Sequence, residues 1–202
     1  MGAVDELIAA TFGVRDLSRS PVVVTGSRER LAALFAALGY RRGVEVGTER
    51  GVFAEILCQA NPSLRLDAVD AWTTYRGYVD HTDQSALDAA WAETVERLRP
   101  YPNAQAIKAW SVEAARQHAD LSLDFVYIDA NHEFTQVVAD LAAWGPKVRR
   151  GGMLSGHDYR KSKNNAPYHV VQAINGYTAA HKIHPWFVLR GDVHAPSWFW
   201  VR

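Results

Sequence analysis

An acid and two glycines stand close together early in the chain, at Glu45, Gly47 and Gly51. Glu45 lies inside the short apolar run 44–46, and an apolar helical run begins at about residue 52. Glycine suits a turn in which the backbone takes a positive φ or passes close to a ligand, and a helix N-terminus presents free N–H groups. The spacing lacks one glycine of the dinucleotide pattern Gly-x-Gly-x-x-Gly. We therefore expect a strand, a glycine turn and a helix around a ligand other than a dinucleotide, although an ordinary strand-to-helix turn fits the same pattern.

A second acid, Asp70, closes the next predicted strand, residues 64–70. In nucleotide-binding α/β folds a carboxylate about 20 residues after the glycine turn accepts hydrogen bonds from ribose hydroxyls. The aromatic residues that follow, Trp72, Tyr75 and Tyr78, could stack on an adenine, line an acceptor pocket or cap the edge of the fold.

Two acids and two histidines mark the ends of two later strands, at Asp129, His132, His157 and Asp158. Neighbouring carboxylates repel unless a cation or a proton neutralises them, and hard oxygen ligands suit Mg²⁺, Mn²⁺ or Ca²⁺. A neutral imidazole beside an acceptor can instead take a hydroxyl proton. We expect His157, paired with Asp158, to be the general base, whereas His132 fits a catalytic, metal-binding or helix-packing role equally well.

Strands and helices alternate along the part of the chain that carries these residues. This alternation predicts an α/β fold, a Rossmann-like doubly wound sheet that is mostly parallel and has seven strands. The aromatic runs 186–189 and 198–201 predict a terminal antiparallel hairpin. Residues 1–40 are expected to form an N-terminal helical extension and residues 41–202 the core, in a single domain. The valine-rich stretch at residues 20–26 fits either an extended segment or a packing loop.

Composition narrows the class of partner. The 22 basic and 22 acidic residues cancel, so no overall field favours nucleic acid or an anionic membrane, and a small-molecule acceptor is favoured. The one cysteine, Cys58, fits a reducing compartment, and neither a membrane span nor a basic secretory start is present in the sequence. We expect a cytoplasmic protein, with a homodimer as one option for its assembly.

Four motifs follow one another between residues 129 and 159. They are Asp-x-x-His-x-Phe from Asp129, Asp-Leu-x-x-Trp from Asp140, Gly151-Gly152, and Gly-His-Asp-Tyr from Gly156. Together with the glycine loop, this series resembles the family 24 group of class I S-adenosylmethionine-dependent methyltransferases, over Arg42 to about Tyr159. Two positions depart from the family pattern, because Arg150 replaces a proline and Phe134 replaces a tyrosine.

The resemblance implies a role for most of these residues. The cofactor S-adenosylmethionine would contact the loop, the end of the second strand and the end of the third, at Glu45, Gly47, Thr48, Gly51, Asp70, Ala71, Trp72, Trp110, Ser111 and Asp129. Glu45 would meet the methionine end and Asp70 the ribose. Catalytic residues would be Asp129, His157 and Asp158.

A metal is also implied by the resemblance. In catechol O-methyltransferase and its relatives, two aspartates at the corresponding strand ends bind Mg²⁺, and Asp129 and Asp158 occupy those positions. The third ligand there is an asparagine, which Tyr159 replaces in this chain. Tyr159 and residues 160–166 are expected to cover the acceptor.

The activity implied is O-methylation of a small hydroxylated molecule, with or without help from the metal. Two alternatives stay open at this point. One is a module that binds S-adenosylmethionine without turnover, and the other is an enzyme of the same fold that uses a different nucleotide cofactor.

Overall fold

The computed structural model describes residues 3–75, 83–161, 168–191 and 195–202. The elements, in chain order, are α1 (Ala3–Phe12), β1 (Val22–Thr25), α2 (Arg28–Ala37), β2 (Arg42–Val46), α3 (Val52–Ala60), β3 (Arg65–Asp70), α4 (Gln84–Leu98), β4 (Ala104–Lys108), α5 (Ser111–Ala115), β5 (Leu123–Ile128), α6 (Phe134–Trp144), the short 3₁₀ helix η1 (Gly145–Lys147), β6 (Val148–Gly156), α7 (Val170–Ala180), β7 (Phe187–Arg190) and β8 (Ser197–Val201).

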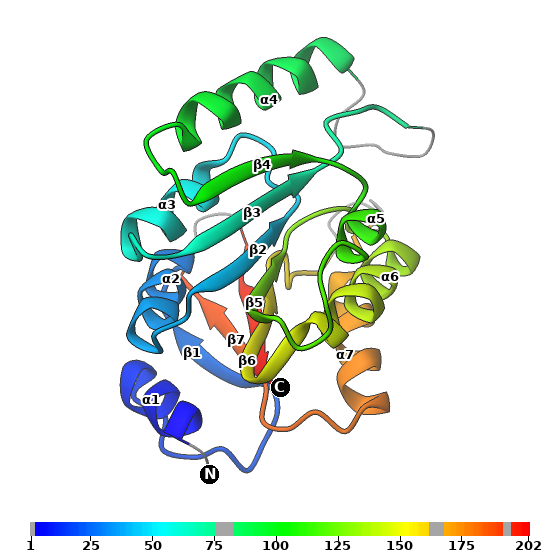
Figure 1. Ribbon diagram of the computed structural model, residues 1–202. Coiled ribbons are helices and arrows are strands. Elements are labelled where there is room, and N and C mark those ends of the chain that lie inside the picture. The colour runs from blue at the N-terminus through cyan, green and yellow to red at the C-terminus, as the bar shows by residue number, and fades with distance from the viewer. Residues whose placement is uncertain (1–2, 76–82, 162–167, 192–194) are drawn as a thin grey trace.

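One sheet joins all of these strands in the order β1-β7-β8-β6-β5-β2-β3-β4 (Figure 1). The ladders are parallel except on either side of β8, which runs antiparallel to both β6 and β7. The predicted doubly wound sheet and its terminal antiparallel hairpin are therefore confirmed. Because β5 is covered on both faces, its near-continuous apolar sequence suits the middle of the sheet.

The number of strands differs from the predicted seven, because the described residues form eight. The extra strand is β1, which pairs in parallel with β7, so that Val22 lies opposite Phe187. Residues 20–26 were expected to be either an extended segment or a packing loop, and they contribute this edge strand to the N-terminal extension, between α1 and α2. Their partner lies about 160 residues further along the chain, so no local pattern could show the pairing.

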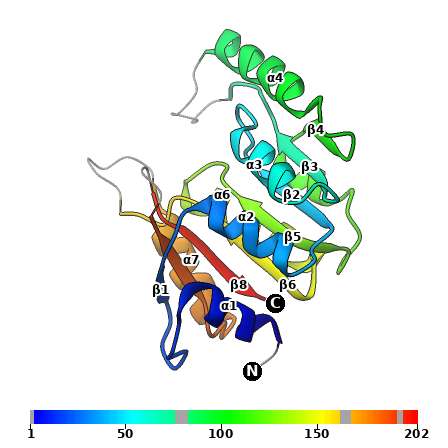
Figure 2. The ribbon, with the colours of Figure 1, turned by 90° about the vertical axis from the view of Figure 1, so that its left-hand side faces the viewer.

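Helices cover both faces of the sheet (Figures 1 and 2). On one face α1, α2 and α3 pack against a core that includes Ile8, Phe35 and Phe125. On the other face α5, α6 and α7 enclose a second core around Trp144 and Ile174. Among the described residues no helix is both long enough and apolar enough to cross a membrane.

Candidate active site

The carboxyl ends of the parallel strands surround a cavity of about 730 Å³. Following the sheet from β6 through β5, β2 and β3 to β4, these ends bring Asp158, Asp129, Glu45, Asp70 and Trp110 to one edge. Nine of the residues expected at the site line the cavity, namely Glu45, Gly47, Thr48, Asp70, Ala71, Trp110, Ser111, Asp129 and Asp158. Three do not, namely Gly51, Trp72 and His157.

The glycine loop between β2 and α3 is held by close backbone contacts. Gly47 has φ +86°, donates its N–H to the Val69 carbonyl over 2.8 Å, and leaves room for the backbone of Asp129. A Cβ on Gly47 would stand 2.1 Å from the Asp129 carbonyl oxygen. Gly51 has φ +72° at the start of α3, facing Thr94. Gly51 therefore shapes the loop from behind, whereas Gly47 forms part of the cavity wall.

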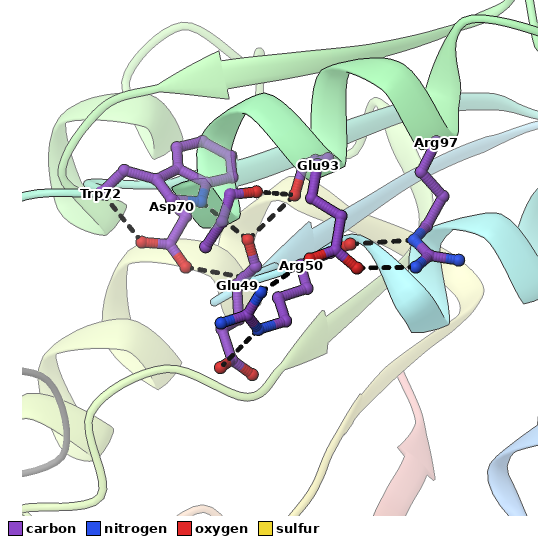
Figure 3. A network of polar contacts seen from close by, with 8 residues as sticks. Glu49, Arg50, Asp70, Trp72, Glu93 and Arg97 are labelled. Carbon is purple, nitrogen blue, oxygen red and sulfur yellow. Dashed lines mark hydrogen bonds and ion pairs between the residues drawn. The ribbon is translucent and has the colours of Figure 1, made fainter. Parts of the chain in front are cut away.

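The peptide groups of Glu49 are clamped from both sides (Figure 3). Asp70 Oδ2 accepts the Glu49 N–H over 2.9 Å, and its Oδ1 accepts the Trp72 N–H over 3.0 Å. The Glu49 carbonyl accepts the Trp72 indole N–H over 2.7 Å and the Thr94 hydroxyl over 2.9 Å. Asp70 therefore orders the loop. It also lines the cavity, and a carboxylate oxygen that accepts one hydrogen bond can accept a second.

Trp72 was expected to contact a cofactor, but its side chain does not line the cavity in this structure. Trp72 is fully buried and lies edge-on to Trp91, with ring centroids 4.6 Å apart. Its indole faces the loop, where it donates to Glu49, because φ +41° at Trp72 turns the chain beneath the loop. Of the other two aromatic residues in this segment, Tyr75 lines the cavity, and Tyr78 lies outside the described residues.

Charged side chains tie the outer side of the loop to α3 and α4 (Figure 3). Arg50 contacts Glu93 over 2.7 Å, and Arg97 contacts both Glu93 and Glu55 over 2.8 and 2.7 Å. Arg97 also donates to the Arg50 carbonyl over 3.0 Å. These groups are partly exposed, so their main effect is to fix the position of the loop.

Glu45 is buried in the wall of the cavity, with 2% of its surface exposed. Burial raises the pKa of its carboxyl group to about 8. The Thr48 hydroxyl interacts with the Glu45 carboxyl group and lowers its pKa, but among the described residues Glu45 Oε2 and Thr48 Oγ1 have no partner at full hydrogen-bond geometry. Since buried polar atoms are rarely left without a partner, these two atoms mark a place for a polar ligand group.

The far end of the cavity is aromatic. Trp110 is 42% exposed and meets the Tyr75 ring edge-on, with centroids 5.2 Å apart. The Ser111 hydroxyl donates to Asp140 and accepts the Trp144 indole N–H over 2.9 Å. Burial raises the pKa of the Asp140 carboxyl group to about 6. Ser111 therefore fixes the position of the Asp140 side chain, and the neighbouring residue Trp110 exposes its ring.

At the opposite end, Asp129 and Asp158 are bridged by two histidines. His132 Nε2 lies 3.1 Å from Asp158 Oδ2 and 3.7 Å from Asp129 Oδ1. His157 Nδ1 lies 3.2 Å from Asp158 Oδ2 and 3.6 Å from Asp129 Oδ2. Arg160 Nε contacts the other oxygen of Asp158, Oδ1, over 2.9 Å. Three cationic or protonatable groups therefore surround two carboxylates.

The two carboxylates keep both imidazoles charged. Burial lowers the pKa of each ring, but Asp129 and Asp158 outweigh it and raise the pKa of His132 to about 10 and that of His157 to about 9. Burial opposes ionisation of Asp158 too, yet the histidines hold its pKa far below the usual range. In this state His157 carries a proton at neutral pH and stands behind the cavity wall, so it differs from the neutral general base that we expected.

The acidic cluster has the composition of a metal site. Asp129, His132 and Asp158 each offer one ligand atom, and these atoms lie within 4.8 Å of one another. The two aspartates were expected as ligands. His132 offers a third donor atom from a different position than the asparagine of catechol O-methyltransferase and its relatives. Tyr159 takes no part, because its hydroxyl donates to Asn175 over 2.8 Å and its ring packs on Trp186. Of the expected cover, residues 162–167 lie outside the described residues.

Several cavity residues were not predicted, and three of them carry polar groups into the site. Arg28 enters from the start of α2, Tyr168 stacks on His132 with ring centroids 4.6 Å apart, and Asp140 reaches in from α6. The sequence motif Asp-Leu-x-x-Trp could have indicated Asp140 as a site residue. In the structure both the Asp and the Trp of this motif contact Ser111. Arg28 is the first residue of α2, and Tyr168 lies shortly before α7. At such positions the periodicity of the sequence does not predict where a side chain points.

Comparison with solved structures identifies the fold. An O-methyltransferase from Bacillus cereus in complex with SAH shares 15% identity and a TM-score of 0.65, over 98% of this chain and 90% of that chain. The O-methyltransferase TomG from Streptomyces achromogenes in complex with SAM shares 16% identity and a TM-score of 0.65, over 100% and 90%. The N-methyltransferase NodS from Bradyrhizobium japonicum shares 15% identity and a TM-score of 0.58, over 85% and 91%.

The family is established at the level of sequence. No curated protein sequence matches this chain. A family model of the family 24 type, described as a methyltransferase domain, does match it over residues 44–159, which is more than half of the chain. The matched segment begins in β2 and ends just after β6, so it holds the glycine loop, Asp70 and the acidic cluster. The protein is therefore an enzyme of the methyltransferase domain family.

Proposed function

We propose that the cavity binds S-adenosylmethionine and that the protein transfers its methyl group to an oxygen of a small hydroxylated molecule. The observation that carries this proposal is the order of groups along one sheet edge. Glu45 and the Gly47 turn stand in the middle, Asp70 and Trp110 lie on one side, and the acidic cluster lies on the other. A donor whose adenosine lies toward Trp110 has its sulfonium near the middle of this edge, within reach of an acceptor at Asp129.

Charge favours a hydroxyl acceptor over an amine. His132, His157 and Arg160 place positive charge around Asp129 and Asp158. Positive groups that are fixed in a partly buried site stabilise an oxygen that becomes negative as its proton leaves. An amine acceptor gains positive charge during methyl transfer, so the same groups would oppose it. Relatives of similar fold include both O- and N-methyltransferases, and the charge pattern is what favours oxygen here.

The donor atoms of Asp129, His132 and Asp158 also fit a divalent cation, provided that His132 gives up its proton, because only a neutral imidazole has a lone pair for a metal. Carboxylates suit Mg²⁺ and Mn²⁺, whereas an imidazole ligand extends the choice toward Zn²⁺ and Fe²⁺. A cation held there would supply the positive charge that lowers the pKa of an acceptor hydroxyl. The fit is supported by one carboxylate oxygen of Asp158, Oδ2, that faces the cluster while Arg160 contacts the other.

The methyl group of a sulfonium is already electrophilic, so alignment and proton removal are the main tasks of the protein. In the proposed reaction the acceptor oxygen bonds to the methyl carbon as the carbon–sulfur bond breaks and the hydroxyl proton passes to water, and the products are a methyl ether, S-adenosylhomocysteine and a proton. Asp129 and Asp158 orient the imidazoles, and Tyr168 covers His132 on its flat face. These residues would hold the acceptor oxygen in line with the donor.

The test is methyl transfer from labelled S-adenosylmethionine to a panel with a catechol, a simple phenol, an aliphatic diol and a primary amine, with EDTA or with Mg²⁺ or Mn²⁺. We expect label in methyl ethers, and a loss of about 10²- to 10⁴-fold in Asp129→Asn. Asp120→Asn is the matched control, because Asp120 is exposed and pairs with Lys147 away from the cavity. Equal or faster transfer to the amine would contradict the oxygen specificity.

The remaining proposals concern the cellular location, the partners and the assembly of the enzyme. We infer a cytoplasmic, reducing location from Cys58, which is the one cysteine of the sequence and is buried. The balanced charge supports a small-molecule acceptor, with no nucleic acid or membrane as a partner. A homodimer is one option for the assembly, and sedimentation analysis of the purified protein would test it.

A further inference from the structure

Arg28 brings a guanidinium to the cavity from outside the segment that the family model matches. It is the first residue of α2, which follows β1 and therefore begins at the same sheet edge as the loop after β2. The Arg28 Cζ atom lies 5.4 Å from the centroid of the Phe53 ring, and Phe53 belongs to α3 just beyond the glycine loop. The start of a helix adds partial positive charge at this place.

Arg28 and Glu45 act on the same part of the cavity. Burial raises the pKa of Glu45, and the positive charge of Arg28 lowers it, so the two groups are close enough to interact. Both line the cavity, and Glu45 Oε2 has no hydrogen-bond partner in the described part of the chain. The Glu45 carboxyl group, in the middle of the sheet edge, and the Arg28 guanidinium therefore line the same cavity.

The other cationic groups of the cavity wall are engaged elsewhere. Arg50 contacts Glu93 over 2.7 Å on the outer side of the loop. His132 lies 3.1 Å from Asp158 in the acceptor cluster. Among the described residues, Arg28 is the cation whose charge lowers the pKa of Glu45.

An amino-acid head group needs two opposite partners. Its ammonium group requires an acceptor such as a buried carboxylate, and its carboxylate is best bound by the planar fork of an arginine. We propose that Arg28 binds the α-carboxylate of the methionine moiety of the donor while Glu45 Oε2 accepts from its ammonium group. This inference rests on the proposed function, and it assigns a donor-binding residue outside the matched family segment.

The experiment compares two ligands that differ in the amino-acid head. S-adenosylhomocysteine carries the head, whereas 5′-methylthioadenosine keeps the adenosine and the thioether and lacks it. Calorimetric titrations of both ligands are run on the wild type, Arg28→Gln, Arg28→Lys and Arg116→Gln. Arg116 is the matched control, because it is exposed and does not line the cavity.

In Arg28→Gln we expect the Kd of S-adenosylhomocysteine to rise by about 10- to 100-fold, the range for a lost charge-assisted hydrogen bond. The Kd of 5′-methylthioadenosine should stay within about twofold, which also shows that the variant is folded. Arg28→Lys should recover part of the affinity, because lysine keeps the charge without the fork. Arg116→Gln should bind both ligands as the wild type does.

Three results would overturn the inference, and they differ from one another. Unchanged binding of S-adenosylhomocysteine in Arg28→Gln would show that Arg28 does not touch the head group. Equal weakening of both ligands would show that Arg28 only shapes the cavity. Failure of the wild type to bind either ligand would overturn the proposed function itself, and the role of Arg28 with it.

Discussion

On the donor side of the cavity, hydrogen bonds to backbone groups hold the wall in place and ion pairs lie on the outer side of the loop, whereas on the acceptor side ionised side chains hold one another. The Glu49 peptide groups are bound by Asp70, Trp72 and Thr94, which leaves the glycine loop little freedom. Asp129 and Asp158 are held instead by His132 and His157 at 3.1 to 3.7 Å. A backbone framework suits one fixed ligand, and a charge cluster can change its protons or take up a cation.

The two sides meet at one contact. Gly47 of the donor loop packs against the Asp129 carbonyl, and the Asp129 side chain belongs to the charge cluster. This close approach of the two backbones, which leaves no room for a Cβ on Gly47, therefore fixes the donor loop relative to the acceptor cluster. Four substitutions would separate the contributions of the two sides.

The largest effect is expected for Gly47→Ala, which would break the contact between the two sides. A Cβ at 2.1 Å from the Asp129 carbonyl oxygen, together with φ +86°, should lower the free energy of unfolding by about 3 kcal/mol or more and abolish donor binding. Gly39→Ala is the control, because Gly39 has φ +68° and nothing within 4 Å of an added Cβ. It should cost about 1–2 kcal/mol and leave binding intact. Equal behaviour of the two variants in denaturant unfolding and ligand titration would contradict the tight contact.

Asp158→Asn would change the acceptor side of the cavity and leave the donor side intact. Removal of one carboxylate takes a ligand from the Asp129, His132 and Asp158 group, so the affinity for Mn²⁺ should fall by about 100-fold or more. Binding of S-adenosylhomocysteine should change by less than about twofold, because the donor loop does not rest on Asp158. Calorimetry with each ligand measures both effects. Unchanged Mn²⁺ affinity would argue against a cation in this cluster.

Glu45→Gln tests a carboxyl group that is buried on the donor side. Burial raises the pKa of Glu45 from about 4.5 to about 8, so the folded state favours the protonated carboxyl. This contribution to stability is complete below about pH 4.5 and is lost as pH rises through 8. The melting temperature of the wild type should therefore fall by roughly 5 °C or more over this range relative to the variant. Parallel melting curves from pH 5 to 9 would show that Glu45 is not buried as described.

The smallest effect is expected for Thr94→Val, which removes one hydrogen bond from the clamp on Glu49. The hydroxyl donates to the Glu49 and Ala90 carbonyls, each over 2.9 Å, and the residue is fully buried. Unfolding should become easier by about 1 kcal/mol, and the Kd of S-adenosylhomocysteine should rise by about two- to fivefold. Thr178→Val is the control, because Thr178 is also buried and donates within α7, away from the loop. A similar loss of ligand affinity in both variants would show that the clamp does not govern binding.

Strand ends were the most predictable part of this molecule. In a parallel sheet the carboxyl ends meet at one edge, so an acid at the end of a recognisable strand can be placed before the structure is known. Asp70, Asp129 and Asp158 were placed in this way, and all three line one cavity. The family motifs gave the same positions, and the matched family model confirms the recognition.

What the sequence could not show depends on contacts between distant segments. The pairing of β1 with β7, and hence the approach of Arg28 to the cavity, joins segments at opposite ends of the chain. Trp72 was expected to meet a cofactor because it follows Asp70, but its positive φ turns the indole under the loop. The charge of His157 also could not be foreseen, because it depends on two carboxylates from separate strands.

The most direct test of the central claim is a calorimetric titration of the purified protein with S-adenosylhomocysteine, beside Asp70→Asn and Asp67→Asn. Asp67 lies on the same strand but faces a different cleft, where it contacts His118 over 3.5 Å. We predict micromolar binding to the wild type and to Asp67→Asn, and a Kd at least about 10-fold higher in Asp70→Asn. Absence of binding to the wild type, or undiminished binding to Asp70→Asn, would contradict the assignment of this cavity as the donor site.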